Sequence, residues 1–216
     1  MRIPLTPHGT RELLLFTAVL ALLAWGAWAM WPPLVAVPSL LFLFLLSFFR
    51  DPERTSPDDP VAAVAPADGK VTDIEEVDEP HVLGGRALRI GIFLSVFDVH
   101  VNRAPLDGTV TRVLYAPGKF LDARRPECVA ENEANLAGFT GPRGPFAVRQ
   151  VAGLIARRIV FPMKVGDRVA RGQRMGMIKF GSRTELLVPA DAPVEVAVKV
   201  GQRVRGAETV LLRYRA

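Results

Sequence analysis

The run KFGSRTELLVP, Lys179 to Pro189, holds the residues with the clearest potential for chemistry. Gly181 and Ser182 stand between two strand-like segments, and Gly-Ser at such a place usually forms only a turn, because glycine tolerates the backbone of a tight hairpin. A serine hydroxyl can also act as a nucleophile when a base lies beside it. The local sequence leaves both interpretations open.

Cysteine and histidine offer few other candidates. The single cysteine, Cys128, cannot form an internal disulfide, which predicts a reducing compartment, and it lies in a polar stretch without a catalytic signature. The three histidines show no metal-ligand spacing, so we expect no metal site. They are His8, His81 and His100.

The charge balance favours a membrane surface over a nucleic acid as partner. The net charge is +5, from 27 Lys and Arg against 22 Asp and Glu. No basic run with interleaved aromatic residues occurs, so we expect no nucleic-acid partner. An anionic membrane suits the modest positive charge better, because the chain also carries a long apolar segment.

This apolar segment runs from Leu13 to Phe49 without a charged residue. The Trp31-Pro32-Pro33 step must end a helix, so we expect two apolar helices, Leu13 to about Met30 and Leu34 to Phe49. The second is short for a full crossing. A signal peptide and a buried soluble hairpin are the alternatives. Basic residues flank the segment on both sides and place both ends in the cytoplasm: Arg2, Arg11, Arg50 and Arg54.

The domain plan follows from composition. Residues 1–50 form the membrane-associated helical hairpin, residues 51–60 are a linker rich in Pro, Asp and Ser, and residues 61–216 form a β domain. Gly and Pro, 18 of each, indicate many short strands. Strand-like runs are KVTDIEEV, RALRIGIFLSVF, GTVTRVLYAP and two within FAVRQVAGLIARRIVF, broken at Gly153. Only ECVAENEANLAGF has helix-forming composition, and it is short enough to be a loop.

A weak internal repeat suggests the type of β fold. The pattern V-G-x-R-V begins at Val165 and again at Val200, each time as a polar turn before a hydrophobic strand. This repeated pattern resembles the sequences of biotinyl and lipoyl domains and of the related sugar-phosphotransferase carrier domains, whose fold is a flattened β-sandwich, or barrel-sandwich hybrid. A membrane-anchored carrier or binding module is therefore the second candidate function. The lysine that such carriers modify is absent from the hairpin tip, which disfavours this alternative.

Six motifs in order resemble the short bacterial and archaeal form of phosphatidylserine decarboxylase. They cover the chain from about Phe48 to its C-terminus: FFRDPER, PADGKV, FDVHVNRAP, APGKFLDA, RQVAGLIARRI and FGSR. Each motif alone is weak, and together they are specific. The resemblance implies decarboxylation of phosphatidylserine to phosphatidylethanolamine and CO2.

The resemblance also implies an origin for the catalytic group. The Ser182 hydroxyl would attack the Gly181 carbonyl, and β-elimination would leave a β chain of residues 1–181 and an α chain of residues 182–216. Ser182 would become a covalent pyruvoyl group that forms a Schiff base with the substrate amine. Neither a metal nor pyridoxal phosphate is implied. The two chains would stay together as a heterodimer, and a higher oligomer is an alternative. The resemblance and the apolar segment together imply a location at the cytoplasmic face of the cell membrane.

A nucleophilic serine needs a base, and the base needs an orienting group. His100 in FDVHVNR and Asp68 in PADGK are the candidates, while an ordinary strand histidine and an Asp-Gly turn are the structural alternatives. The long form of the family has H-x-x-H here, and its second histidine corresponds to Arg103. Arg103 could hold a phosphate or carboxylate, or form an ion pair with Asp98.

Overall fold

The computed structural model describes residues 5–122, 128–154, 158–179 and 182–215. The chain forms two compact units, Met1–Glu53 and Arg54–Ala216. The first is helical and the second is built mainly of β-strands, which confirms the predicted fold class.

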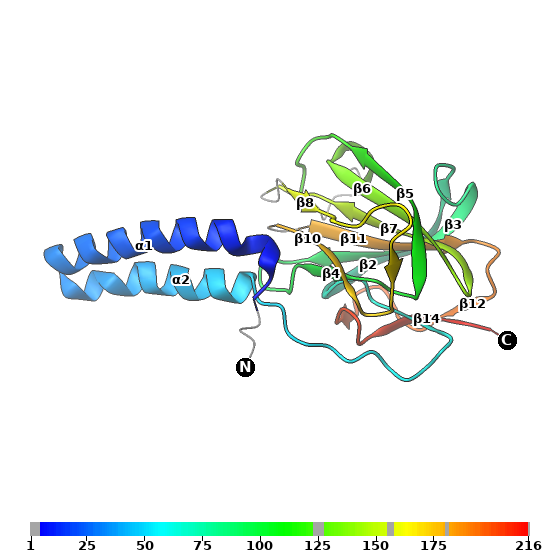
Figure 1. The fold of residues 1–216 in the computed structure, drawn as a ribbon, viewed down its shortest axis with the longest axis horizontal. Helices are drawn as coiled ribbons and strands as arrows, with labels where there is room; N and C mark the ends of the chain where they lie inside the picture. The colour runs from blue at the N-terminus through cyan, green and yellow to red at the C-terminus, as the bar shows by residue number, and fades with distance from the viewer. Residues whose placement is uncertain (1–4, 123–127, 155–157, 180–181, 216) are drawn as a thin grey trace. The chain divides into compact units, whose positions relative to one another are not determined.

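Two apolar helices make up the first unit (Figure 1). Helix α1, Thr10–Met30, and helix α2, Ala36–Phe48, are each preceded by a short 3-10 turn, Pro7–Gly9 and Pro32–Val35. The Pro32-Pro33 pair begins the second turn, as prolines suit the first positions of a helix but not its interior. The predicted helical hairpin is therefore confirmed.

The surface of the helical unit is apolar. The stretch Pro7–Met30 is long and apolar enough to cross a membrane, and only 6% of its most apolar window is buried within the protein. The second stretch, Pro32–Phe48, is shorter. The large apolar side chains that are more than half exposed on these helices include Leu14, Leu22, Trp25, Trp28, Met30 and Leu40.

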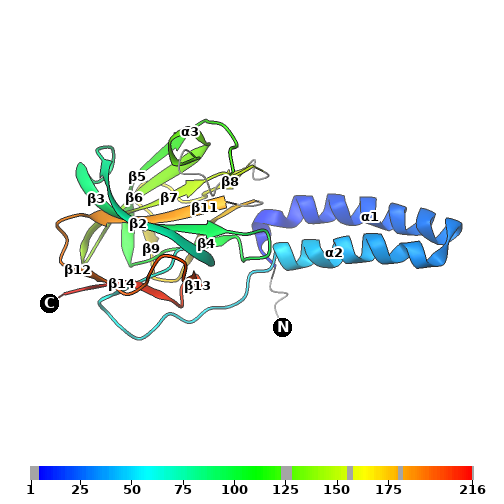
Figure 2. The ribbon, with the colours of Figure 1, turned by 180° about the vertical axis from the view of Figure 1, so that it is seen from behind.

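The described part of the second unit contains three antiparallel sheets. The largest has the strand order β13-β2-β3-β11-β7-β6-β5-β9, and it curls around the core (Figure 1 and Figure 2). Its strands are β2 Gly69–Glu79, β3 Gly85–Leu94, β5 Gly108–Ala116, β6 Ala134–Gly141, β7 Gly144–Val151, β9 Arg168–Val169, β11 Ser182–Pro189 and β13 Arg203–Val204. The smaller sheets are β1-β14-β12, with bounds Ala62–Val64, Val210–Tyr214 and Val194–Val196, and β4-β10-β8, with bounds Val101–Arg103, Arg174–Ile178 and Ile159–Val160.

Strand β11 lies at the centre of the large sheet and is buried on both faces. It pairs with β3 on one side and with β7 on the other. Leu186 and Val188 enter the main core, whereas Leu187 packs with Ala87, Leu136 and Ala147 in a smaller cluster on the opposite face. This division follows the strand period of two, which the sequence shows as Thr184, Leu186 and Val188 alternating with Arg183, Glu185 and Leu187.

The internal repeat forms the two edges of the large sheet. Gly166 and Gly201 take positive φ values of 95° and 90°, and each turn leads into a two-residue strand, β9 at one edge and β13 at the other. Each edge strand then pairs with a strand that follows an Asp-Gly step, Asp107-Gly108 or Asp68-Gly69. The repeat is therefore a structural one with approximate twofold character.

The segment ECVAENEANLAGF differs from its predicted helix or loop. Cys128–Glu131 is a single helical turn, α3, but Ala134–Gly141 is strand β6. Strand β6 pairs with both β5 and β7, so tertiary pairing outweighs the local helix preference of its residues.

Candidate active site

Ser182 is the first residue of the central strand β11 and pairs with Leu94 of β3. It is fully buried, and its Oγ has no hydrogen-bond partner within the described ranges. Buried hydroxyls are nearly always hydrogen-bonded, so an exception points to a functional reason. The other half of the predicted pair, Gly181, lies outside the described residues.

His100 directly precedes β4 and is also fully buried. Its Nδ1 lies 2.9 Å from the backbone oxygen of Asp98. A carbonyl oxygen can only accept, so Nδ1 carries the hydrogen and the lone pair of the neutral ring is on Nε2. This is the tautomer that a general base requires.

Strand β10 links His100 to the segment that leads into Ser182. The backbone N–H of Ile178 donates to the carbonyl of His100 at 3.3 Å, and Met177 pairs with Val101. Ile178 ends β10, and Ser182 begins β11 shortly afterwards. β10 and β11 belong to different sheets rather than to the predicted hairpin, and the fold places the histidine beside the end of β10, four residues before Ser182.

A buried chain of uncharged polar groups connects β4, which follows His100, to β11, which begins with Ser182. Asn102 of β4 donates from Nδ2 to Thr184 Oγ1 at 3.0 Å. Gln150 of β7 donates to Asn102 Oδ1 at 2.8 Å, and Asn135 of β6 donates to Gln150 Oε1 at 3.1 Å. Thr184, Gln150 and Asn135 lie opposite one another in the large sheet, so one row of side chains holds Asn102.

Sequence reasoning did not single out this amide chain. Its signal is a polar residue on the core-facing side of a strand, in the motifs FDVHVNR and RQVAG. Only the pairing of β6, β7 and β11 shows that these residues meet.

Asp68 accepts two hydrogen bonds that have different origins. Its Oδ1 accepts the backbone N–H of Gly206 at 2.7 Å, and its Oδ2 pairs with Arg54 at 2.9 Å. In the other copy of the repeat, Asp107 Oδ1 accepts the backbone N–H of Arg171 at 2.8 Å. The bond from Gly206 to Asp68 therefore has an equivalent in the other copy of the repeat, at Asp107. The ion pair of Asp68 with Arg54 is what distinguishes it from Asp107.

Arg103 ends β4 and is buried. Its Nη1 donates to the carbonyl of Gly172 at 3.1 Å. Asp98, the ionic partner considered for it, pairs with Arg203 at 3.1 Å and accepts the backbone N–H of Ser95.

The lone cysteine does not have the character of a nucleophile. Burial raises the pKa of the Cys128 thiol to about 11, so it stays protonated at neutral pH. Among the residues that the structure describes, no group of three His, Cys, Asp or Glu side chains could hold a metal ion.

Comparison with known proteins identifies a family. The family model "Phosphatidylserine decarboxylase" matches residues 41–212. The phosphatidylserine decarboxylase proenzyme of Carboxydothermus hydrogenoformans is 52% identical over 174 residues, 81% of each chain. The proenzyme of Rhodopirellula baltica is 45% identical over 98% of this chain and 89% of the relative, and that of Trichlorobacter lovleyi is 44% identical over 97% and 96%.

The amide chain generates a stability prediction. Thr184→Val keeps the side-chain shape but removes the oxygen that accepts from Asn102, which leaves a buried N–H unpaired. We expect the free energy of unfolding to fall by about 1–3 kcal/mol, measured by urea denaturation. Thr140→Val, at an exposed threonine of β6, is the matched control and should cost much less. Equal stability of the two variants would show that the Asn102–Thr184 bond does not hold the strands together.

Proposed function

We propose that this chain, which belongs to the phosphatidylserine decarboxylase family and decarboxylates phosphatidylserine, makes its own catalytic group by cutting itself between Gly181 and Ser182. The proenzyme names of the relatives imply cleavage into two chains. The observation that carries the choice of bond is Ser182, whose buried Oγ has no hydrogen-bond partner in the described part of the chain.

The proposed cleavage balances without an external oxidant or metal. Ser182 Oγ attacks the Gly181 carbonyl, and the acyl group passes from nitrogen to oxygen, which gives an ester and a free amine. Loss of the Cα proton expels the carboxylate, so one chain ends at Gly181 and the other begins with dehydroalanine. Water then replaces the nitrogen, which leaves as ammonia, and position 182 becomes a pyruvoyl group.

His100 is the base that we assign to the first step. Its Nδ1–H donates to the Asp98 carbonyl, which leaves Nε2 as the site that accepts the hydroxyl proton. The Asp98 carbonyl orients the ring through Nδ1, and Asp68 is the group that we propose to stabilise the charged form of the ring. The amide chain that runs from Asn135 to Thr184 supports the assignment of His100. It fixes β4, which follows His100, against β11, which begins with Ser182.

Once formed, the pyruvoyl ketone supplies the electron sink for loss of CO2 from the substrate. The residues of the chain do the rest. The burial of position 182 excludes bulk water, which favours loss of the carboxylate charge. A proton must then reach the carbon that lost CO2, and His100 is the group that we assign to deliver it. The product is phosphatidylethanolamine.

The carrier alternative is not favoured. The relatives from Carboxydothermus hydrogenoformans, Rhodopirellula baltica and Trichlorobacter lovleyi, which match most of the chain, are all named as decarboxylase proenzymes. The resemblance of the repeat to such carriers is therefore one of β architecture.

We further propose that the protein works at the cytoplasmic face of the cell membrane, with its β and α chains held together. The apolar surface of α1 and the basic residues around the helices support this location. Arg103, the buried last residue of β4, is the residue that we propose to contact the phosphate or carboxylate of the substrate.

The cleavage proposal is tested by Ser182→Ala. This variant has no hydroxyl to attack the preceding carbonyl, so we expect a single full-length chain on a denaturing gel and no decarboxylation. The wild type should give two chains, with masses by intact mass spectrometry that place the break before residue 182. A wild type that decarboxylates while remaining one chain would rule out the proposed origin of the group.

Comparison with Asp107, the equivalent residue in the other copy of the repeat, distinguishes a catalytic role of Asp68 from its structural bond. Asp68→Asn and Asp107→Asn each weaken the same kind of backbone contact, to Gly206 or to Arg171, and Asp68→Asn also breaks the ion pair with Arg54, so it should lose the larger amount of stability. Only Asp68→Asn should slow self-cleavage or turnover, by on the order of tenfold or more, because only Asp68 is assigned to His100. The measurements are a cleavage time course and kcat. Equal cleavage and turnover in both variants would remove Asp68 from the mechanism.

The membrane proposal is tested by a chain that begins at Asp51. It keeps Arg54, which pairs with Asp68 and Glu208 inside the β unit. We expect this chain to move largely to the soluble fraction and still to cleave itself, because the proposed cleavage residues all lie in the β unit. Undiminished recovery with the membrane fraction would show that the β unit carries its own anchor.

A further inference from the structure

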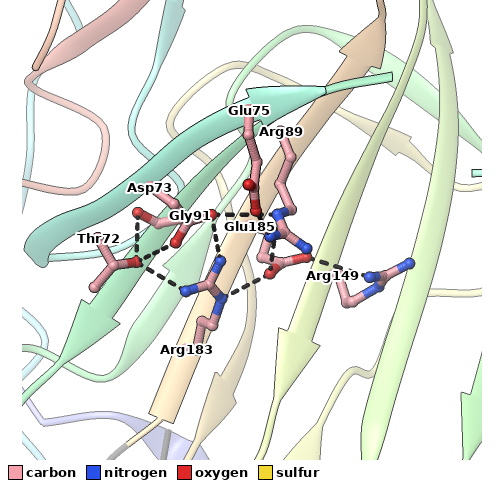
Figure 3. Close-up of polar contacts among 8 residues, drawn as sticks. All are labelled: Thr72, Asp73, Glu75, Arg89, Gly91, Arg149, Arg183 and Glu185. Atoms are coloured by element: carbon pink, nitrogen blue, oxygen red, sulfur yellow. Dashed lines mark hydrogen bonds and ion pairs between the residues drawn. The ribbon is translucent and has the colours of Figure 1, made fainter. Parts of the chain in front are cut away.

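A cluster of charged side chains crosses the large sheet (Figure 3). It includes Arg183, the residue after Ser182, and lies on the face of β11 opposite Thr184 and the amide chain. Arg183 is at its centre and is only 5% exposed, and Glu185 is fully buried. The remaining members are Thr72, Asp73, Glu75, Arg89 and Arg149, which come from β2, β3 and β7.

Arg183 uses each nitrogen of its guanidinium for a different partner. Nε donates to Glu185 Oε1 at 2.6 Å, Nη2 donates to Asp73 Oδ1 at 2.7 Å, and Nη1 donates to Thr72 Oγ1 at 2.8 Å. Glu185 belongs to the same strand, but Thr72 and Asp73 belong to β2, with β3 in between. The side chain therefore ties β11 to a strand two places away in the sheet.

Two local features of the strands allow the Arg183 side chain to reach β2 across β3. The register of β2 against β3 shifts between Val71 and Asp73, so Thr72 is the extra residue of a bulge. In a regular strand, Thr72 and Asp73 would point to opposite faces, whereas here both contact Arg183. The second feature is Gly91 of β3, where an added Cβ would lie only 2.6 Å from Arg183 Cζ and from Asp73 Oδ2. A larger residue at this position would therefore collide with the Arg183–Asp73 pair.

The charges in this cluster are balanced, with Arg89, Arg149 and Arg183 against Asp73, Glu75 and Glu185. Burial raises the pKa of Asp73, but the hydrogen bonds from Arg183 and Thr72 outweigh it and hold that pKa below its usual value. Burial lowers the pKa of Arg183, and Asp73 and Glu185 more than reverse this effect. Buried ion clusters are costly to desolvate and are a weak means of adding stability, so their position in the fold needs another explanation.

The position of Arg183 in the pairing pattern supplies that explanation. Ser182 pairs with β3, but the pairing of β11 with β7 begins only at Arg183, opposite Val151. After the proposed cleavage, residue 182 is the first residue of a separate chain, and a strand end held on one side frays readily. Nothing covalent on its N-terminal side then keeps the new end in place.

We propose that Arg183 is a positioning residue that anchors the new end of the α chain, so that the group formed from Ser182 stays in the site after cleavage. The proposal rests on the proposed cleavage between Gly181 and Ser182. Arg183 does not touch the reacting atoms in this role. Its hydrogen bonds to Thr72 and Asp73 hold residue 183 against the β chain, which fixes the neighbouring residue on the opposite face of the strand.

The test uses full-length Arg183→Met, compared with Arg183→Lys and with Arg86→Met as the matched control. Arg86 of β3 pairs with Glu76 of β2, but the side chains of this pair are 65% and 52% exposed. We expect Arg183→Met to cleave and then to show kcat at least tenfold lower, with KM for phosphatidylserine vesicles changed much less. Arg183→Lys should recover only part of kcat, because one ammonium cannot reproduce the three-way fork. Arg86→Met should match the wild type.

A second readout separates anchoring from general destabilisation. The ketone of the cleaved protein is treated with hydroxylamine, and the rate of its loss is followed by mass spectrometry of the α chain. A frayed end exposes position 182, so this rate should rise several-fold in Arg183→Met and stay at the wild-type value in Arg86→Met. If Arg183→Met does not fold, Asp73→Asn replaces it, because this variant weakens the β2 end of the anchor and leaves the α chain unchanged.

The outcomes distinguish this inference from the function on which it rests. A wild type that yields no second chain, or an α chain without a ketone, contradicts the proposed cleavage itself. A wild type that cleaves normally, with kcat and hydroxylamine rate unchanged in cleaved Arg183→Met or in Asp73→Asn, contradicts the anchoring role alone.

Discussion

The pairing of β11 between β3 and β7 is the constraint on which the candidate site depends. A strand with neighbours on both sides has all its backbone groups satisfied, and here its side chains are buried on both faces as well. A chain break before Ser182 leaves all eight residues of the strand paired with β3, and five of them, Arg183 to Leu187, paired with β7 as well. The fold can therefore lose a covalent bond at that point and still keep the new chain end near its original place.

The two faces of β11 carry different polar chemistry for different reasons. The inner face uses neutral amides and a hydroxyl, from Asn135 to Thr184, which are cheap to bury when every member has a partner. The outer face uses full charges centred on Arg183, which are costly to bury but hold a fixed geometry when paired on several sides. Ser182 lies on the inner face beside the amides, where no described group bonds its hydroxyl.

The internal repeat shows how a symmetric scaffold acquires an asymmetric site. Asp68 and Asp107 accept equivalent backbone bonds, and the turns at Gly166 and Gly201 close the two edges of the sheet in the same way. Only the copy that contains Asp68 adds an ion pair with Arg54. The backbone bonds thus explain one carboxylate oxygen in each copy, and the second oxygen of Asp68 forms the ion pair with Arg54 that the repeat does not share.

The sequence by itself determined the helical hairpin, the β character of the second unit, the alternation along Thr184 to Val188 and the family, because each depends on local pattern or on motifs in order. It did not determine that ECVAENEANLAGF is largely strand, since pairing with β5 and β7 overrides the local preference. Nor did it predict the partners of Asn102 or Arg183. Those contacts join residues far apart in the chain, and they depend on strand order, on the bulge at Thr72 and on the space at Gly91, which only the tertiary structure decides.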